Sequence, residues 1–259
     1  MIRVSFLITH YNRPHDLVQC VNAINKIACL EDEIVVSDDF SSSENLEIVK
    51  GLKVTQLILA DKNTGLASNL NRGITQCRGK YILYCQEDFI LNLDLKFKLN
   101  LFLEVLDRDI VEMLRLKTYI SFKKMIELDT DLSIIPTFSW CNFLTNPYRY
   151  SDHPFLVKND FFRKNGLYLE NTSGGYGETE YAIRLAHAKT RIGMTYKSYA
   201  SVLQNSNSVM VNEVGHKPIS INMNKKVIRF LRVTRLYFEW ILYSDQKRGL
   251  ITYKNQRKS

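Results

Sequence analysis

Short apolar runs alternate with segments of helical spacing over the first 116 residues, and this alternation limits the folds open to the chain. The runs are rich in β-branched residues, are of strand length and cover residues 2–9, 33–37, 53–59, 80–85 and 110–116. Helical segments are predicted to start at Pro14, Ser43, Leu66 and residue 94. Strands that alternate with helices form a mostly parallel sheet with helices on both faces. The sequence therefore predicts an α/β fold of the Rossmann-like kind.

The second half of the chain is less regular. Residues 117–150 show no clear period and are rich in aromatic side chains. Short helices are predicted over 158–165 and 178–189, and the Asn- and Ser-rich segment 200–222 is predicted to be rich in loops. Helical spacing returns over residues 224–243, which we interpret as an amphipathic C-terminal appendage.

Polar clusters follow three of the predicted strands. They are Thr9–Arg13, Asp38–Asp39 and Gln86–Asp88. In open parallel sheets, ligands bind beyond the carboxyl ends of the strands, where such clusters meet. The alternative is that loops are simply polar, but three clusters at one edge favour a binding site.

The positive charge of the chain is confined to its end. Residues 225–259 hold ten basic and two acidic side chains, which accounts for the whole formal charge of +8. A nucleic-acid-binding protein would carry a basic face on the folded body, so that class is excluded. The basic helix has two interpretations, which are docking on an anionic membrane surface and packing on the body with a solvated charged face.

The cysteines and the apolar content bear on location. The five cysteines form no CxxC pair, so reduced thiols in the cytoplasm are expected. The apolar stretch at the N-terminus is too short for a signal peptide, and no run of about 18 apolar residues occurs. We expect a cytoplasmic protein, peripheral on the inner face of the cell membrane if the basic helix binds lipid.

Common nucleotide motifs are absent. No GxGxxG follows the first strand and no GxxxxGK[ST] occurs, because one residue too many separates Gly73 from Gly79 and Tyr81 stands where Ser or Thr is needed. A nucleotidyltransferase should carry a glycine-rich loop with a basic residue after the first strand. The loop ending at Pro14 contains no glycine, so it is not such a loop.

Four motifs together resemble those of family 2 glycosyltransferases of the GT-A fold. In order along the chain they are Thr9-His-Tyr-Asn-Arg-Pro14, Glu33-Ile-Val-Val-Ser-Asp-Asp39, Asn63 to Gly73, and Lys80-Tyr-Ile-Leu-Tyr-Cys-Gln-Glu-Asp88. The likeness spans about residues 2–200, and it lies in the order and spacing of motifs that are weak singly. It implies a nucleotide-diphosphate sugar donor, with UDP, dTDP or GDP as the nucleotide.

The resemblance also assigns donor residues. Thr9, Tyr11 and Arg13 would line the base and ribose pocket, and Asp39 would accept from the N3–H of uracil or thymine. Asn71 matches the Asn of the family's Ala-Arg-Asn-x-Gly segment, with Leu70 at the Arg position. Arg72 would supply the missing charge to the diphosphate.

Gln86-Glu87-Asp88 stands in the place of the family's DxD motif. Carboxylate oxygens hold the hard cation that a sugar diphosphate needs, so Mg²⁺ or Mn²⁺ is the implied cofactor and Asp88 the implied ligand. Gln86 would hydrogen-bond the ribose, and Glu87 keeps negative charge at the site. His216 is either a further metal ligand or an ordinary surface histidine.

The implied catalytic base is Glu178, in the segment Gly174-Gly-Tyr-Gly-Glu178-Thr-Glu180. In an inverting transfer, a carboxylate takes the proton of the attacking hydroxyl. The alternative is a helix N-terminal carboxylate favoured by the dipole. Glu180 and Arg184 are spaced i and i+4, which predicts a structural ion pair.

These expectations define one enzyme hypothesis and one rival. The first is an inverting glycosyltransferase of bacterial cell-surface polysaccharide synthesis, acting on a glycan or lipid-linked glycan. Its GT-A domain would span 1–222, with a nucleotide-sugar-binding half at 1–116 and an acceptor-side half at 117–222, followed by a basic helix and tail at 223–259. The rival is a catalytically inactive GT-A-like scaffold at the membrane surface, suggested by Gln86 and Leu70.

Overall fold

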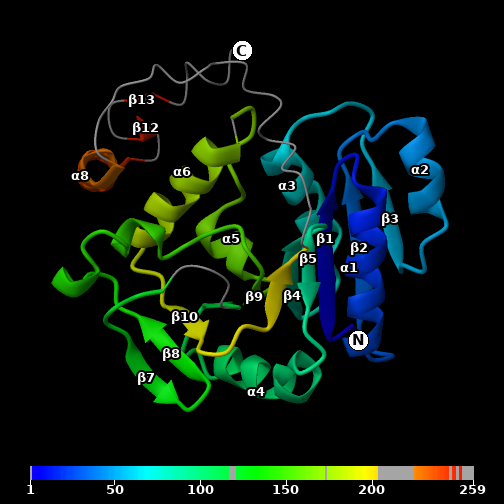
Figure 1. Ribbon diagram of the computed structural model, residues 1–259, viewed down its shortest axis with the longest axis horizontal. Coiled ribbons are helices and arrows are strands. Elements are labelled where there is room, and N and C mark those ends of the chain that lie inside the picture. The colour runs from blue at the N-terminus through cyan, green and yellow to red at the C-terminus, as the bar shows by residue number, and fades with distance from the viewer. Residues whose placement is uncertain are drawn as a thin grey trace.

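The fold is built on a nine-stranded sheet, which the computed structural model shows in the order β3-β2-β1-β4-β9-β6-β10-β8-β7 (Figure 1). The structure describes residues 2–116, 121–172, 174–203, 225–244, 247–248 and 251–252. The strands of the sheet are β1 Val4–His10, β2 Glu33–Asp38, β3 Gln56–Leu59, β4 Tyr81–Gln86, β6 Met113–Arg115, β7 Ile126–Asp129, β8 Leu132–Ile135, β9 Phe155–Lys158 and β10 Ile192–Thr195. Two small pairs stand apart, β5 Phe89–Leu91 with β11 Ala200–Val202, and β12 Lys247–Arg248 with β13 Ile251–Thr252.

Helices cover both faces of this sheet. They are α1 Pro14–Ile27, α2 Ser43–Lys50, α3 Leu66–Gln76, α4 Leu95–Asp107, α5 Phe161–Asn165, α6 Gly174–His187 and α8 Lys225–Ile241, with 3₁₀ turns η1 Trp140–Asn142 and η2 Asn146–Tyr148. Figure 1 places α1 on one side of the sheet and α3 on the other. This is the predicted α/β architecture.

The direction of the strands determines at which edge of the sheet the site lies. Strands β1, β2, β3 and β4 pair in parallel, and so do β6 and β10. Strand β9 runs antiparallel between β4 and β6. The carboxyl ends of β1, β2 and β4 therefore meet at one edge, and the residues that lead into β9 start from that same edge.

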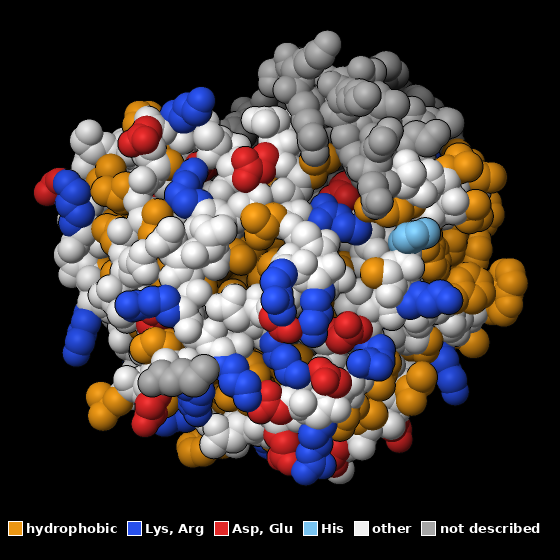
Figure 2. All heavy atoms as spheres, turned by 180° about the vertical axis from the view of Figure 1, so that it is seen from behind, with side chains coloured by type: hydrophobic (Ala, Val, Ile, Leu, Met, Phe, Trp, Pro, Cys, Tyr) orange, Lys and Arg blue, Asp and Glu red, His pale blue; other side chains and the backbone are white. Residues whose placement is uncertain are grey.

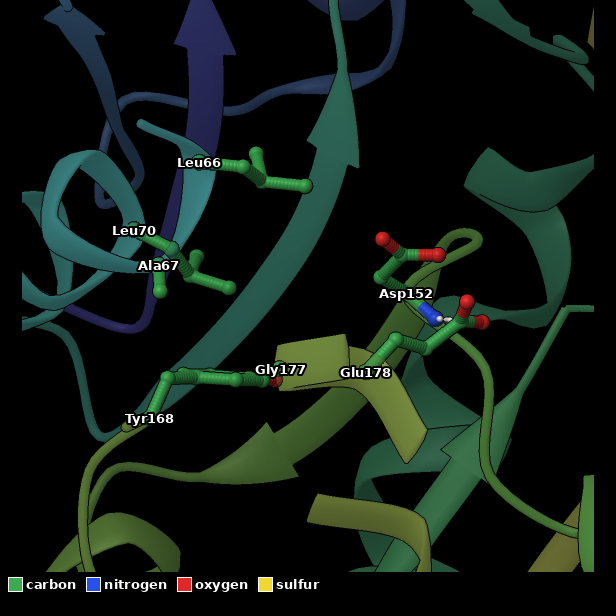
Figure 3. A pocket seen from close by; sticks show the side chains of 7 residues that line it. All are labelled: Leu66, Ala67, Leu70, Asp152, Tyr168, Gly177 and Glu178. Carbon is green, nitrogen blue, oxygen red and sulfur yellow. Dashed lines mark hydrogen bonds between the residues drawn. The ribbon is translucent and has the colours of Figure 1, made fainter. Parts of the chain in front are cut away.

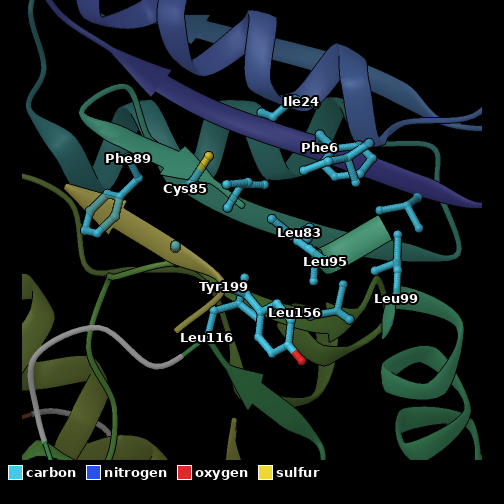
Figure 4. Packing of buried hydrophobic residues seen from close by; sticks show 14 of the residues in the cluster. Phe6, Ile24, Leu83, Cys85, Phe89, Leu95, Leu99, Leu116, Leu156 and Tyr199 are labelled. Atoms are coloured by element: carbon cyan, nitrogen blue, oxygen red, sulfur yellow. The ribbon is translucent and has the colours of Figure 1, made fainter. Parts of the chain in front are cut away.

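Side-chain alternation divides the core into two layers. In β1, Phe6 and Ile8 point into the layer under α1, α2 and α4, whereas Leu7 points into the layer under α3, α5 and α6. Figure 4 shows the first layer, where Leu83 of β4 and Leu156 of β9 pack with α4. Every residue of β1 and β2 is buried, which explains why these strands are continuous apolar runs.

The predicted elements of the first half are confirmed, with shifts of up to three residues at the ends. The helix predicted over 158–165 is wrong at its start, because residues Phe155–Lys158 form β9 and α5 begins at Phe161. A four-residue strand buried on both faces has no polar alternation to mark it. Strands β7, β8 and β10 were not predicted either, because each is only four residues long.

Helix α8 packs on the body through one face. Val233 and Leu236 are buried, and the Tyr237 hydroxyl donates to the Phe143 carbonyl at 2.8 Å. The other face leaves large apolar side chains exposed, namely Val227, Ile228, Phe230, Leu231, Phe238 and Ile241. Among the described helices, none combines the length and apolar content that crossing a bilayer requires.

Candidate functional site

Parallel register brings the predicted strand-end residues together. Thr9 pairs with Gln86 across β1 and β4, and His10 pairs with Asp38 across β1 and β2. Thr9 is buried, with its hydroxyl 3.1 Å from the Tyr84 hydroxyl, so its side chain lies inside the sheet edge. Tyr11 is half-buried in the loop that follows.

A buried histidine and aspartate brace that loop. His10 Nε2 accepts from the backbone N–H of Arg13 at 3.0 Å, so its Nδ1 carries the proton donated to Asp38 at 2.6 Å. The Ser41 hydroxyl and backbone N–H also donate to Asp38, at 2.5 and 2.8 Å. Burial raises the pKa of Asp38, but these donors outweigh burial and the net pKa is lowered. The brace fixes Arg13 relative to the end of β2.

Asp39 holds the turn that leads into α3. Its carboxylate accepts from the backbone N–H groups of Thr64 and Gly65, at 3.1 and 2.7 Å. Gly65 has φ of 84°, a conformation that favours glycine. Arg72 lies 3.6 Å from Asp39 and donates to the Thr64 hydroxyl at 3.0 Å. Both oxygens of Asp39 thus have protein donors, and Arg72 points toward this turn.

Asn71 and Leu70 shape the other side of α3. The Asn71 amide donates to the Tyr168 carbonyl and to Glu170, and its oxygen accepts from the Tyr168 N–H at 2.9 Å. Leu70, at the family's Arg position, is buried in the core under α3. Asn71 therefore braces the segment around Tyr168, and Leu70 makes the neighbouring wall apolar.

Arg13 reaches across to the end of β4. Its guanidinium lies 3.3 Å from an oxygen of Asp88 and 3.8 Å from one of Glu87. Burial raises the pKa of Glu87 to about 8 and also raises that of Asp88, against the opposing charge of Arg13. We call Arg13, Glu87 and Asp88 the β4 carboxylate cluster.

The β4 carboxylate cluster fits a divalent cation in one respect. Asp88 Oδ1 is buried and has no hydrogen-bond partner among the described residues, so a hard oxygen ligand is available there. No group of three His, Cys, Asp or Glu side chains with metal-ligand geometry occurs in the described part of the chain. Mg²⁺ is commonly held by one or two carboxylates plus substrate phosphates, so a single protein carboxylate is compatible with it. His216 lies outside the described residues.

A pocket lies between α3 and the first turns of α6 (Figure 3). Its lining residues are Leu66, Ala67, Leu70, Asp152, Tyr168, Gly177 and Glu178. Figure 3 shows the side chains of Asp152 and Glu178 next to each other at one end, and Leu66 and Leu70 at the other. The backbone N–H of Asp152 donates to Glu178 Oε1 at 3.4 Å. The pocket thus has an apolar wall from α3 and two neighbouring carboxyl groups.

Arg115 lies beneath these carboxyl groups. It is 1% exposed at the end of β6, and its Nη1 donates to the carbonyls of Tyr148 and Arg149 at 2.9 and 2.8 Å. Burial lowers the pKa of Arg115 to about 10, while the charges of Glu178 and Asp152 raise it. Its Nε is buried without a hydrogen-bond partner among the described residues.

Glu180 and Arg184 form the ion pair that their spacing predicts. The guanidinium contacts Glu180 at 2.5 Å and also donates to the carbonyls of Asn165 and Leu167. The pair fastens α6 to the loop before it. Because Glu178 is near the N-terminal end of α6, the pair also holds the helix that carries it.

The comparisons with known proteins identify the family of the chain. The family model described as Glycosyl transferase family 2 matches residues 5–166. The chain belongs to glycosyl transferase family 2. The match covers β1 to the loop after α5 and thus includes the β4 carboxylate cluster. The comparison with curated proteins finds no relative.

Solved structures show the same fold. The chain is similar to S. aureus TarS 1–349 in complex with UDP-GlcNAc, with a TM-score of 0.63, 18% identity, and coverage of 95% of this chain and 68% of that one. TarS 1–349 in complex with UDP gives 0.62 and 17%, with coverage of 95% and 67%. The chain covers 41% of a longer TarS structure, at a TM-score of 0.61 and 17% identity. These likenesses show the GT-A glycosyltransferase fold, and glycosyl transfer follows from membership of the family.

The structure brings some predicted residues together and separates others. Arg13, Gln86, Glu87 and Asp88 gather at the ends of β1 and β4, whereas Asp39 and Arg72 lie at the turn before α3. Gln86 Nε2 lies 3.5 Å from the Asp152 carbonyl and so joins the cluster to the pocket. Sequence reasoning missed Asp152 and Arg115. The available signal was that the apolar run 110–116 contains two charged residues, of which Arg115 is one and Glu112 the other.

Proposed function

We propose that the chain is an inverting glycosyltransferase that moves a sugar from a nucleotide diphosphate to a hydroxyl acceptor. The observation that carries the proposal is the place of Glu178, a carboxylate that lines a pocket next to the strand ends where donors bind in this fold. Family membership supports glycosyl transfer. Beyond glycosyl transfer, we propose that the reaction inverts the anomeric centre and that Glu178 is its base.

In the proposed reaction, Glu178 accepts the proton of the acceptor hydroxyl as that oxygen attacks the anomeric carbon. The leaving diphosphate departs from the opposite face of the sugar. Asp88, through Oδ1, would hold Mg²⁺ or Mn²⁺ together with diphosphate oxygens, with His216 as a further ligand. When bound, the cation supplies neutralising charge for the leaving group.

The donor residues are proposed by their positions. Thr9, Tyr11 and Arg13 would contact base and ribose, and Gln86 the ribose hydroxyls. Asp39 would accept a hydrogen bond from the base N3–H. Its oxygens already accept from the N–H groups of Thr64 and Gly65, so the base would use a further lone pair of the carboxylate. Asn71 and Arg72 would line the part of the site that holds the diphosphate, and Glu87 would keep negative charge there.

A uridine diphosphate sugar is the first donor to test, because two of the similar TarS structures are complexes with UDP-GlcNAc and with UDP. The panel should also include dTDP- and GDP-sugars, with a glycan or a lipid-linked glycan as acceptor. Mass spectrometry would follow the product with Mg²⁺, with Mn²⁺ and with a chelator. Transfer from one donor supports the proposal, and no transfer from any donor to either acceptor contradicts it.

An inactive scaffold is the second candidate function. It is favoured by Gln86 in the first position of the DxD-like motif and by Arg13 lying against Asp88. Calorimetry with the same nucleotide sugars separates the two candidates. Binding with a cation supports the enzyme, whereas no binding to any of them supports the scaffold.

We also propose that residues 1–222 are the transferase domain and that 223–259 dock the protein on the inner face of the cell membrane, as in synthesis of cell-surface polysaccharide. Support comes from the exposed apolar face of α8, which carries Arg229 and Arg232 alongside Phe230 and Leu231. In Figure 2, hydrophobic side chains gather along the edge of the molecule on the α8 side. Basic and apolar groups side by side suit an anionic lipid surface.

Liposome flotation tests the membrane proposal. Replacing Phe230 and Leu231 by Ser should reduce binding to anionic vesicles by about tenfold, because buried apolar area is lost. The matched control is Ile126→Ser with Leu128→Ser, which removes exposed apolar groups from β7. Equal binding by the α8 variant and the control contradicts the docking surface.

A further inference from the structure

Two carboxyl groups share the end of the pocket in Figure 3. Asp152 is 8% exposed and lies just before β9, whereas Glu178 comes from α6. The Asp152 N–H donates to Glu178 Oε1 at 3.4 Å, and Figure 3 shows the two carboxyl side chains next to each other. We call Asp152 and Glu178 the carboxyl pair.

The surroundings of the carboxyl pair favour one retained proton. Burial raises the pKa of Asp152 well above its ordinary value, and the neighbouring Glu178 raises it further. The guanidinium of Arg115, from β6, is the opposing positive charge. The tyrosine hydroxyls near the pair, those of Tyr84, Tyr150 and Tyr168, have raised pKa values and are neutral at pH 7. His153, which follows Asp152 in the sequence, is also neutral, because burial lowers its pKa to about 4. One guanidinium beside a buried and a half-buried carboxyl group balances a single negative charge on the pair, which favours one proton kept between the two groups.

We propose that Asp152 is a positioning residue for Glu178, to which its carboxyl O–H and its backbone N–H both donate. The two donors fix the orientation of the Glu178 carboxylate and stabilise its charged form. The remaining lone pairs of Glu178 then face the pocket and accept the proton of the acceptor. This inference rests on the proposed function and adds the residue that holds its base.

The proton inventory of the step balances. The acceptor O–H bond breaks and its proton goes to Glu178, while the acceptor oxygen forms a bond to the anomeric carbon. The bond from that carbon to the diphosphate oxygen breaks, and its electron pair leaves with the diphosphate. The proton of Asp152 is present before and after the step, so Asp152 needs no exchange with solvent during turnover.

Two substitutions separate positioning from a merely structural role. Asp152→Asn keeps an N–H donor in place of the carboxyl O–H, so kcat should stay within about threefold of wild type. Asp152→Ala removes the donor, and loss of a hydrogen bond to a charged group should lower kcat by about 10- to 100-fold with little change in the donor KM.

Equal losses of kcat in Asp152→Asn and Asp152→Ala would overturn the proposal. A measurement that needs no activity is the titration of ¹³C-labelled aspartate carboxyl groups by NMR, with the Asp152 signal assigned by its absence from Asp152→Asn. The wild-type signal should titrate well above ordinary aspartates and should move down in Glu178→Gln, because the neighbouring charge is gone. An ordinary midpoint in the wild type overturns the carboxyl pair. A raised midpoint in a protein that transfers no sugar overturns the proposed function alone.

Discussion

The β4 carboxylate cluster, and the carboxyl pair taken together with Arg115, each comprise two carboxylic acids and one arginine, but the arrangements differ. In the cluster, Arg13 lies 3.3 Å from Asp88 and 3.8 Å from Glu87. At the pair, the Nη1 of Arg115 donates to two backbone carbonyls, and the backbone N–H of Asp152 donates to the Glu178 carboxylate. Carboxylates that pair with a guanidinium can exchange it for another cation, which suits a site that binds a charged ligand. Two neighbouring carboxyl groups tend to keep one proton between them, which suits a site of proton transfer. We therefore expect donor binding at the first and proton transfer at the second.

The largest expected effect comes from Glu178→Gln. General base catalysis contributes about 10²- to 10⁴-fold, so the transfer rate should fall by about 1,000-fold. Donor affinity, measured by calorimetry, should stay within about twofold because the β4 carboxylate cluster is untouched. The matched control is Glu127→Gln on the exposed strand β7, which should transfer at the wild-type rate. Loss of donor binding in Glu178→Gln would contradict the assignment of donor binding to the β4 carboxylate cluster and of proton transfer to the carboxyl pair.

The opposite pattern is expected for Asp88→Asn. Removing the charge beside the unpartnered Oδ1 should weaken cation-dependent donor binding by about 10- to 100-fold. The acid limb of the pH profile should stay in place, because the carboxyl pair is intact. Titration of donor at several Mn²⁺ concentrations, together with the pH profile, measures both. A moved acid limb with unchanged donor affinity would reverse the assignment.

Stability should respond to pH at the carboxyl pair. The folded pKa of Asp152 is raised above its unfolded value, so between the two values the folded state binds more protons. The free energy of unfolding of the wild type should therefore fall as pH rises through that window, by up to about 1.4 kcal/mol per pH unit. Asp152→Asn lacks this contribution. Chemical denaturation from pH 4 upward should therefore show the free energy of unfolding of the variant rising relative to that of the wild type. A constant difference across pH would contradict the raised pKa.

A smaller effect is expected from Arg13→Met. The substitution leaves Asp88 without its opposing charge, which should lower the free energy of unfolding by about 1–3 kcal/mol. Added Mn²⁺ should then raise the melting temperature of the variant more than that of the wild type. Thermal unfolding with and without Mn²⁺ measures the difference. Equal shifts would mean that the guanidinium and the cation do not compete for Asp88.

The sequence predicted the first half of the fold well because its signals are local. Helix starts such as Pro14 and the apolar strand runs need only neighbouring residues, and the meeting of three strand ends follows from parallel topology. The resemblance then identified the family, which the family match confirms. The roles of the individual donor residues stay predictions.

The carboxyl pair was not predictable in this way. Asp152 lies 26 residues from Glu178, and the two meet because β9 runs antiparallel between β4 and β6. The strand is too short and too buried to show a period. Likewise, Arg13 meets Asp88 across 75 residues through the reach of a long side chain, which no motif spacing records.

The central claim is a single displacement in which Glu178 takes the proton of the acceptor. The most direct measurement is the anomeric configuration of the product, read by proton NMR from a reaction of the full chain with a nucleotide sugar, Mn²⁺ and its acceptor. We predict a glycosidic bond of the anomeric configuration opposite to that of the donor. A product with the donor's own configuration would require a different mechanism and would contradict the role given to Glu178.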